Sequence, residues 1–316
     1  MGCKKDINRH RDLIPHFEAP TFLDQYHGVA IACSGGVDSM ALAHFFFANS
    51  SKFGQKKIQV LHANYGLRGQ DSDLDQKCVE DFCDLNQIPF DILTTHRPPQ
   101  TGIQAWARQQ RRSWFQQFAD HGWLITLAHH QDDIAENVLL RMCRGSSPGH
   151  LAGLRVHSSP YWRPLLSVNK AQIRAYANSF QIPFREDQSN FKNNYSRNTI
   201  RNQIIPQLEN IYPHASQRIA RAATQAQQIA DWIRKPYQNR TSIQADEIKG
   251  LPIAVADEII QAIVGGKQQW LSESILSKIQ QNLRNNINSC WTRPDGVRIL
   301  IKDHKLWTAE ATAKEI

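Results

Sequence analysis

The stretch Val29-Ala30-Ile31-Ala32-Cys33-Ser34-Gly35-Gly36-Val37-Asp38-Ser39 joins a short apolar run directly to a serine–glycine turn. The apolar run predicts a buried strand, and residues 40–49 predict a helix. Two glycines allow the backbone to approach a phosphate without a Cβ in the way. The helix N-terminus adds unpaired N–H groups and the positive end of the helix dipole. Strand, turn and helix together predict a phosphate-binding site.

The side chains of this turn suit a nucleotide. The hydroxyls of Ser34 and Ser39 can donate hydrogen bonds to phosphate oxygens. Asp38 repels phosphate and would act through a bound Mg²⁺. The turn lacks the Gly-Lys-Ser/Thr sequence of a Walker A loop. Residues 264–267 also fail that pattern, because Gln268 follows them.

Three further apolar runs, over residues 58–62, 90–93 and 124–128, predict more strands. Helical patterns lie between them, over residues 104–119 and over a stretch in which Leu74, Cys78, Phe82 and Leu85 recur at helical spacing. Apolar strands that alternate with helices predict an α/β fold, with a parallel sheet covered on both sides. Such sheets bind ligands beyond the carboxyl ends of their strands.

The rest of the chain predicts a mostly helical connecting region and a small C-terminal domain. Ser167 is expected to cap a helix that runs to Phe180, and another helical stretch begins at about Ala215. Residues 291–301 place a Pro-Asp-Gly turn between β-prone segments, which predicts a hairpin. We therefore expect an N-terminal domain with a basic helical extension over residues 1–215, and a second domain over residues 216–316.

The net charge of +8 is concentrated in the second half of the chain. Residues 1–150 hold 15 Lys and Arg against 16 Asp and Glu, whereas residues 151–316 hold 22 against 13. Residues 151–221 alone carry 10 against 3. Such an excess favours binding to a nucleic-acid backbone, and a solvated basic surface is the alternative.

Composition also indicates the cellular compartment in which the protein works. No run approaches the ~20 apolar residues of a membrane helix, and the N-terminus lacks the apolar segment of a signal peptide. The six cysteines include no C-x-x-C pair, which is typical of reduced thiols rather than of a disulfide framework. These features indicate a cytoplasmic protein without membrane contact, and they leave its oligomeric state open.

Polar residues follow two of the expected strands. His62 ends the second, and residues 129–137 follow the fourth with the sequence HHQDDIAEN. If a helix starts near Asp132, the carboxylates of Asp132, Asp133 and Glu136 share its first turn. They could hold Mg²⁺, form a metal site with the histidines, orient an amine, or only interact with the helix dipole.

The turn matches the pattern S-G-G-x-D-S, and the chain thereby resembles the PP-loop ATP-pyrophosphatases, which cleave ATP between its α- and β-phosphates. Eight runs, in order, resemble the tRNA(Ile)-lysidine synthetase family over about residues 28–215. These runs are residues 34–39, 62–68, Ala107-Arg108 with Arg111, 129–136, 139–145, 163–166, Glu186-Asp187 with Ser189-Asn190, and Arg197-Asn198 with Arg201.

The resemblance implies a Rossmann-like PP-loop domain and a specific reaction. Members of that family use ATP to adenylate the wobble cytidine of an isoleucine tRNA with the anticodon CAU. They then join free L-lysine to the base, releasing AMP and pyrophosphate. ATP as substrate, Mg²⁺ as cofactor and a C-terminal domain that contacts tRNA are expected accordingly.

The resemblance also implies residue roles. The expected ATP-binding residues are Ser34, Gly35, Gly36, Val37, Asp38, Ser39, His62 and His129. The expected catalytic residues are Asp38, Asp133, Glu136, Arg108 and Arg201, with Asp38 as the Mg²⁺ ligand. Lysine binding is expected at Asp132, Asp133 and Glu136, and tRNA binding at Arg141, Arg144, Asn190 and Arg197.

Gln104, Arg112 and Gln188 depart from the family pattern, and we assign them no role. Three alternatives remain. A tRNA thiolase of the same superfamily usually has paired cysteines, which this chain lacks. An amide-forming member often carries a glutaminase domain, for which no N-terminal catalytic cysteine is present. A non-catalytic RNA-binding protein would not need the intact turn and carboxylates.

Overall fold

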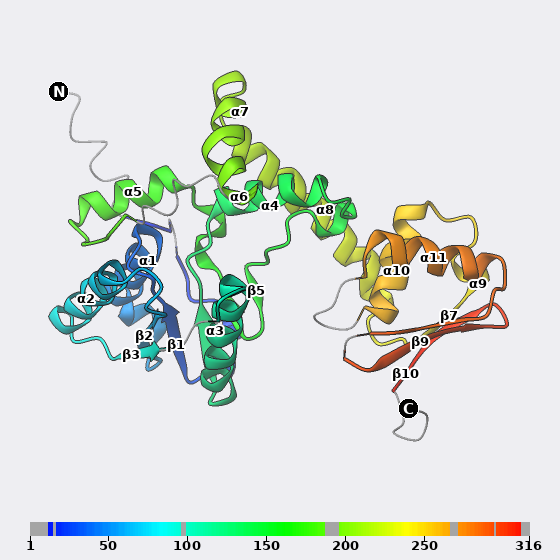
Figure 1. The fold of residues 1–316 in the computed structure, drawn as a ribbon, viewed down its shortest axis with the longest axis horizontal. Coiled ribbons are helices and arrows are strands. Elements are labelled where there is room, and N and C mark those ends of the chain that lie inside the picture. Colours follow the sequence, from blue (N-terminus) through cyan, green and yellow to red (C-terminus); the bar gives the residue numbers. More distant parts are fainter. Residues whose placement is uncertain are drawn as a thin grey trace. The chain divides into compact units, whose positions relative to one another are not determined.

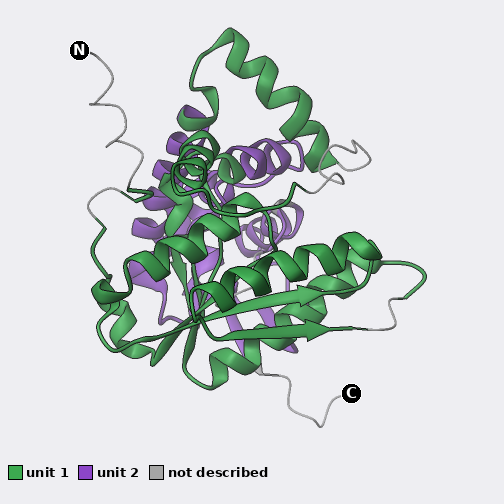
Figure 2. Ribbon diagram, turned by 90° about the vertical axis from the view of Figure 1, so that its left-hand side faces the viewer, with its two compact units in different colours: residues 1–134, 154–217 green, residues 135–153, 218–316 purple. Residues whose placement is uncertain are grey.

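The computed structural model describes residues 12–14, 17–95, 99–186, 196–265, 271–293 and 295–310. It divides into two compact units, shown in different colours in Figure 2. The first unit has residues 1–134 and 154–217, and the second has residues 135–153 and 218–316. The chain passes between them within helices α4 (Gln131–Met142) and α8 (Ala215–Arg234). A domain division at residue 215 stays a prediction.

A six-stranded sheet forms the centre of the first unit (Figure 1). Its strands are β1 (Gly28–Ala32), β2 (Lys57–Asn64), β3 (Phe90–Thr94), β4 (Trp123–Thr126), β5 (His157–Ser158) and β6 (Tyr161–Trp162). Their order is β3-β2-β1-β4-β6-β5, and only β5 is antiparallel to its neighbour. The expected strands are confirmed, and the short strands β5 and β6 were not foreseen.

Helices cover both faces of this sheet, as expected. Successive residues of β1 point to opposite faces. Val29 and Ile31 belong to a large apolar core with helices α1 (Val37–Ala48), α2 (Gln70–Leu85) and α5 (Lys170–Ser179). Ala30 belongs to a smaller core with α3 (Ile103–Asp120), through Phe115.

Helices α2 and α5 are confirmed, with one difference in detail. In α2 the buried apolar side chains are Val79, Phe82 and Cys83, whereas Leu74 and Leu85 are 46% and 84% exposed. Of the four residues noted at helical spacing, Phe82 is buried and Cys78 packs against the core, and the expected helix is confirmed. Helix α5 is capped by Asn169 rather than Ser167, because Asn169 and Gln172 form a reciprocal capping box.

Short elements complete the first unit. They are the 3₁₀ turns η1 (Thr21–Gln25), η2 (Ser50–Phe53) and η4 (Pro164–Ser167), helix α6 (Ser196–Thr199), the π-helical turn η6 (Ile200–Ile204) and helix α7 (Ile205–Ile211). Residues 196–211 run continuously from α6 into α7. A π-helical turn inside a helix is often found at a functional site.

The second unit contains a four-stranded antiparallel sheet in the order β7-β10-β9-β8. Its elements are η3 (Pro148–His150), η7 (Lys235–Tyr237), β7 (Ser242–Gln244), α9 (Ala245–Ile248), α10 (Ile253–Val264), α11 (Glu273–Arg284), β8 (Ser289–Thr292), β9 (Val297–Lys302) and β10 (Lys305–Glu310). The predicted hairpin is confirmed, since β8 pairs antiparallel with β9. None of the helices described in either unit has the length and apolarity needed to cross a membrane.

Candidate active site

The serine–glycine turn lies at the carboxyl end of β1, between β2 and β4 in the sheet. The chain runs from β1 to β2 and β3 on one side of the sheet and then crosses to β4 on the other side of β1, and open α/β sheets bind ligands at such a switch point. Ser39 Oγ accepts a hydrogen bond from Ser34 N at 3.0 Å and donates to the Gly36 carbonyl oxygen at 3.0 Å. No side chain caps the N-terminus of α1. Its first-turn N–H groups therefore remain available to an anion.

Neighbouring segments fix the shape of the turn. Gly35 has a φ of +86°, and a Cβ at this position would lie 3.2 Å from the carbonyl oxygen of Asp75. Arg185 donates its backbone N–H to the Gly35 carbonyl oxygen at 2.9 Å. The Arg185 guanidinium also binds the carboxylate of Asp75 at 2.8 Å, and Arg68 binds the same carboxylate at 2.5 Å. The buried carboxylate of Asp75 is thus bound by two arginines, and this cluster packs against the turn and fixes its shape.

Asp38, in the first turn of α1, is paired with Lys170. The Lys170 ammonium lies 2.6 and 2.5 Å from the two carboxylate oxygens of Asp38. Lys170 is the first residue of α5, and its backbone N–H donates to Asp132 Oδ2 at 2.7 Å. The start of α5 therefore connects the carboxylate that follows β1 with one that follows β4.

His130 lies among three carboxylates at this edge of the sheet. Its ring nitrogens are 3.4 to 3.8 Å from the carboxylates of Asp132, Asp133 and Asp38. Burial opposes the charged imidazolium, but these three carboxylates outweigh it and hold the pKa of His130 above its ordinary value. The three carboxylates thus favour the protonated form of His130.

Asp133 is buried and receives two arginines from the segment around η6. Arg197 and Arg201 donate to Asp133 Oδ1 at 2.9 and 3.2 Å, and the backbone N–H of His130 donates to Oδ2 at 2.9 Å. Burial alone would raise the pKa of Asp133, but the two neighbouring histidines, the His130 N–H and Arg197 lower it overall. Asp133 therefore stays ionised.

The two expected nucleotide-binding histidines differ in setting. His62 is buried, and its Nδ1 donates to the carbonyl oxygen of Cys33 at 2.9 Å, just before the turn. Burial lowers its pKa, so the ring is neutral at pH 7. His129 is half-buried, and burial lowers its pKa to about 4. Contact of either ring with ATP stays a prediction.

The other expected residues are distributed as follows. Glu136 is 1% exposed on α4, one turn beyond Asp132. Arg108 is exposed on α3. Arg141 is half-buried and donates to the His150 carbonyl oxygen at 2.8 Å, while Arg144 is exposed. Asn190 and Gln188 lie outside the described residues.

Sequence reasoning assigned no role to Lys170, Asp75 and Arg185, and considered His130 only as part of a possible metal site. One signal could have found Lys170. A lysine in the first turn of a helix opposes the helix dipole, so its position indicates a nearby carboxylate. The partners of Lys170 and Arg185 are more than 100 positions away in sequence, so that local patterns could not identify them.

The described residues fit Mg-ATP. The turn offers hydroxyls and helix N–H groups to phosphates, with nothing but Ser34 Oγ near a Cβ built on Gly36. Among the residues that the structure describes, no three His, Cys, Asp or Glu side chains could hold a metal alone. Mg²⁺ is commonly held by one or two carboxylates and the phosphates of its nucleotide. Asp38 is the carboxylate in the turn that would hold Mg²⁺, and both of its oxygens are bound by Lys170 in this structure.

Comparison with known families agrees with this geometry. A family model described as a PP-loop domain, of an ATP-binding family, matches residues 9–208. The chain belongs to the PP-loop domain family. Among solved structures, this PP-loop chain is similar to a U34-tRNA thiolase from Methanococcus maripaludis that carries a [4Fe-4S] cluster, with a TM-score of 0.57 and 16% sequence identity. That match covers 72% of this chain and 81% of the thiolase, and it shows the fold alone.

Several named relatives match the PP-loop region more closely. A tRNA(Ile)-lysidine synthase from Xanthomonas axonopodis pv. citri is 35% identical over 201 residues, which cover 62% of this chain and 45% of the relative. One from Chlorobaculum tepidum is 34% identical over 214 residues, covering 64% of each chain. One from an aster yellows witches'-broom phytoplasma is 37% identical over 185 residues, covering 57% and 41%. The matched part is less than two thirds of the length of each relative.

Proposed function

We propose that this chain is a tRNA-modifying ligase that adenylates the wobble cytidine of the CAU-anticodon isoleucine tRNA and joins free L-lysine to it. One observation carries the proposal: the phosphate-binding turn and an ionised carboxylate with two arginines lie at the same edge of the sheet. The relatives named above support the choice of tRNA and lysine.

The first step needs a phosphate site and positive charge. The cytosine O2 attacks the α-phosphorus of ATP, and the bond to pyrophosphate breaks. The turn at Ser34–Ser39 binds the phosphates, and Mg²⁺ at Asp38 would neutralise their charge. Arg201, with Lys170 and His130, supplies positive charge where the phosphoryl group becomes more negative. Arg108 is assigned the same task from α3.

The second step needs a site for a cationic amine. The ε-nitrogen of lysine attacks C2 of the adenylated base, the bond to AMP breaks, and the nitrogen loses a proton. A carboxylate with a lowered pKa binds an ammonium group well but accepts a proton poorly. We therefore assign ammonium binding to Asp133 and Asp132, whose pKa values are both lowered overall. We assign proton acceptance to Glu136.

The remaining assignments concern tRNA. Arg141, Arg144, Asn190 and Arg197 are proposed to contact the tRNA, and residues 216–316 to form a tRNA-contacting domain. An anticodon loop is single-stranded, so the target base leaves its stack at a reduced cost.

Incorporation of radiolabelled lysine tests the function directly. The assay contains ATP, Mg²⁺ and the CAU-anticodon isoleucine tRNA, with the methionine tRNA of the same anticodon as control. We expect lysine in the isoleucine tRNA only, with one AMP released for each lysine. Release of AMP only when a sulfur donor is present would instead establish a thiolase. Binding of tRNA without any turnover would establish a non-catalytic RNA-binding protein.

A further inference from the structure

The antiparallel sheet of the second unit has two different faces. Ile243, Ile299, Ile301 and Leu306 alternate along three strands and are buried. They pack in one apolar core with residues of α10 and α11, which lie along one side of the sheet in Figure 1. This face accounts for the stability of the sheet and needs no ligand.

The opposite face carries an aromatic ring and two lysines. Trp307 pairs with Ser242 on one side and with Leu300 on the other, so that all three point away from the core. Lys305 shares this face, two residues before Trp307, and lies directly opposite Lys302. Both lysines are exposed and Trp307 is partly exposed.

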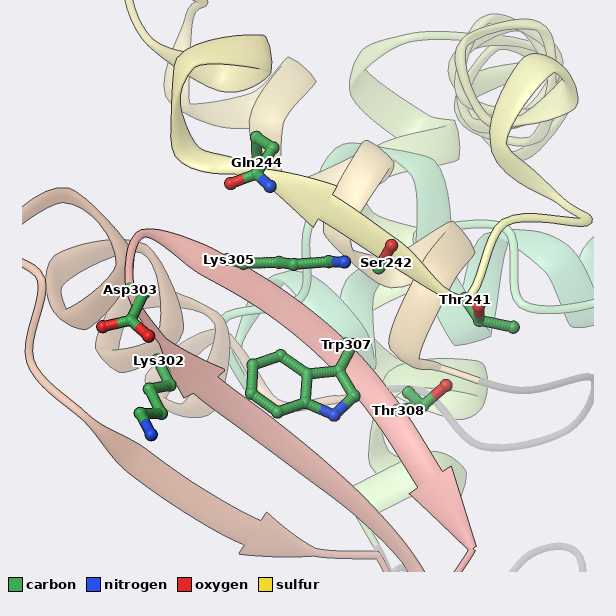
Figure 3. A pocket seen from close by; sticks show the side chains of 8 residues that line it. All are labelled: Thr241, Ser242, Gln244, Lys302, Asp303, Lys305, Trp307 and Thr308. Atoms are coloured by element: carbon green, nitrogen blue, oxygen red, sulfur yellow. The ribbon is translucent and has the colours of Figure 1, made fainter.

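These side chains line an open hollow of about 510 Å³. Figure 3 shows Trp307 together with Lys302, Lys305, Asp303, Ser242 and Gln244 around it. Asp303 is the acidic member, against two lysines. Polar side chains of β7 supply hydrogen-bonding groups at the opposite rim.

The placement of the lysines indicates an anionic ligand. Two like charges directly opposite each other on antiparallel strands repel and destabilise the sheet. A phosphate beside Lys302 and Lys305 would relieve that repulsion. A flat aromatic ring on the same exposed face adds a stacking surface, and this pairing of aromatic rings with basic side chains is how single-stranded nucleic acids are bound.

We propose that this hollow binds an unpaired nucleotide of the tRNA, with its base stacked on Trp307 and its phosphate beside Lys302 and Lys305. The inference rests on the proposed function for the identity of the RNA. Base stacking tolerates different sequences, because every base has a flat face. The hollow therefore contributes affinity for tRNA, and the anticodon is recognised by the first unit, which contains the PP-loop turn.

Lys302→Glu gives the most specific test, because the stability of the fold should not fall whereas the affinity for tRNA should. A glutamate opposite Lys305 converts repulsion into attraction, so the melting temperature should stay equal or rise. Binding of the isoleucine tRNA by the full chain, measured by filter binding without ATP or lysine, should weaken about tenfold. Lys278→Glu, at an exposed lysine of α11, is the control for charge and should change the Kd for tRNA much less.

Trp307 tests the stacking. Trp307→Phe keeps an aromatic face and should bind tRNA close to wild type, whereas Trp307→Leu should weaken binding about tenfold. Trp232→Leu is the matched control, since Trp232 is 77% exposed on α8 of the same unit and outside the hollow. Equal affinity of the Phe and Leu variants would overturn stacking on Trp307.

An unchanged Kd for Lys302→Glu would overturn the nucleotide site as a whole. The two proposals fail separately. If the wild-type chain incorporates lysine and all variants in the hollow bind tRNA normally, only the nucleotide site in the hollow is refuted. If the variants lose tRNA binding as expected but the wild-type chain never incorporates lysine, only the proposed ligase function is refuted. A wild-type chain that binds no tRNA refutes both.

Discussion

At the scale of single residues, the pairing of Asp38 with Lys170 leads to the first prediction. Asp38→Ala removes the carboxylate next to the turn and leaves the Lys170 ammonium without that partner. AMP formation from ATP should fall at least about 100-fold, because charge neutralisation at the phosphates is lost. The Kd for tRNA should change little, since Asp38 has no assigned role in tRNA binding.

Thin-layer separation of labelled AMP and filter binding of tRNA would measure the two effects. Asp24→Ala, at an exposed aspartate of η1, is the matched control and should leave both unchanged. A folded Asp38→Ala protein that loses AMP formation and tRNA binding together would contradict this separation of roles.

His129 gives a prediction about pH. Burial lowers its pKa to about 4 in the folded chain, against about 6.5 when exposed. Between these values the unfolded chain binds a proton that the folded chain does not. The free energy of unfolding should therefore fall as the pH drops from 6.5 to 4, by about 3 kcal/mol from this residue.

Urea unfolding at several pH values measures the contribution of His129, as the difference in the free energy of unfolding between wild type and His129→Gln. The raised pKa of His130 acts in the opposite sense and above pH 6.5, where its contribution is lost as the pH rises, so it does not mask the effect. His121→Gln, at an exposed histidine after α3, should keep the wild-type pH dependence. A His129→Gln curve parallel to wild type from pH 4 to 6.5 would refute the prediction.

At the scale of elements, the turn between β1 and α1 depends on one glycine. Gly35→Ala adds a Cβ at a φ of +86° and 3.2 Å from the Asp75 carbonyl oxygen. Gly102→Ala has a positive φ of +68°, in the left-handed region, and meets nothing within 4 Å. Both should lose about 1–2 kcal/mol from backbone strain, and only Gly35→Ala should also displace the turn and raise the KM for ATP.

Urea unfolding and ATP–pyrophosphate exchange would separate the two costs. The Gly102 variant controls for strain alone, so the extra loss in Gly35→Ala isolates the contact with Asp75. An unchanged KM for ATP in Gly35→Ala would show that the turn tolerates displacement, against its assigned role.

The elements show what sequence could and could not predict. The strands that begin at Gly28 and Trp123 were foreseen because short apolar runs have few alternatives in an α/β fold. The cap of α5 was misplaced because Ser167 and Asn169 are both good caps, and the choice depends on where the chain meets Asp132. Tertiary packing likewise selects which side chains of α2 are buried, since Leu74 and Leu85 of its apolar spacing are exposed whereas Phe82 is buried.

At the scale of the whole molecule, assigned roles are divided between the two units. The PP-loop unit holds the turn, Lys170 and Asp133, which suit chemistry on phosphates and an amine. The second unit holds the hollow around Trp307, which suits affinity for RNA. The sequence motifs of the resemblance end at Arg201, before strands β7 to β10, so the hollow could not be predicted from family motifs and depends on strand register.

The uneven charge of the chain leads to the last prediction. Residues 151–221 carry 10 Lys and Arg against 3 Asp and Glu, and basic side chains on phosphates release bound counterions. The logarithm of the association constant for tRNA should therefore fall linearly with the logarithm of the salt concentration, losing at least about tenfold between 50 and 200 mM. Because phosphate contacts carry no sequence information, the isoleucine and methionine tRNAs should give the same slope while only the first accepts lysine. A response flat in salt would remove the basic segment as a docking surface. Slopes that differ between the two tRNAs would place part of their discrimination in binding rather than in the chemical steps.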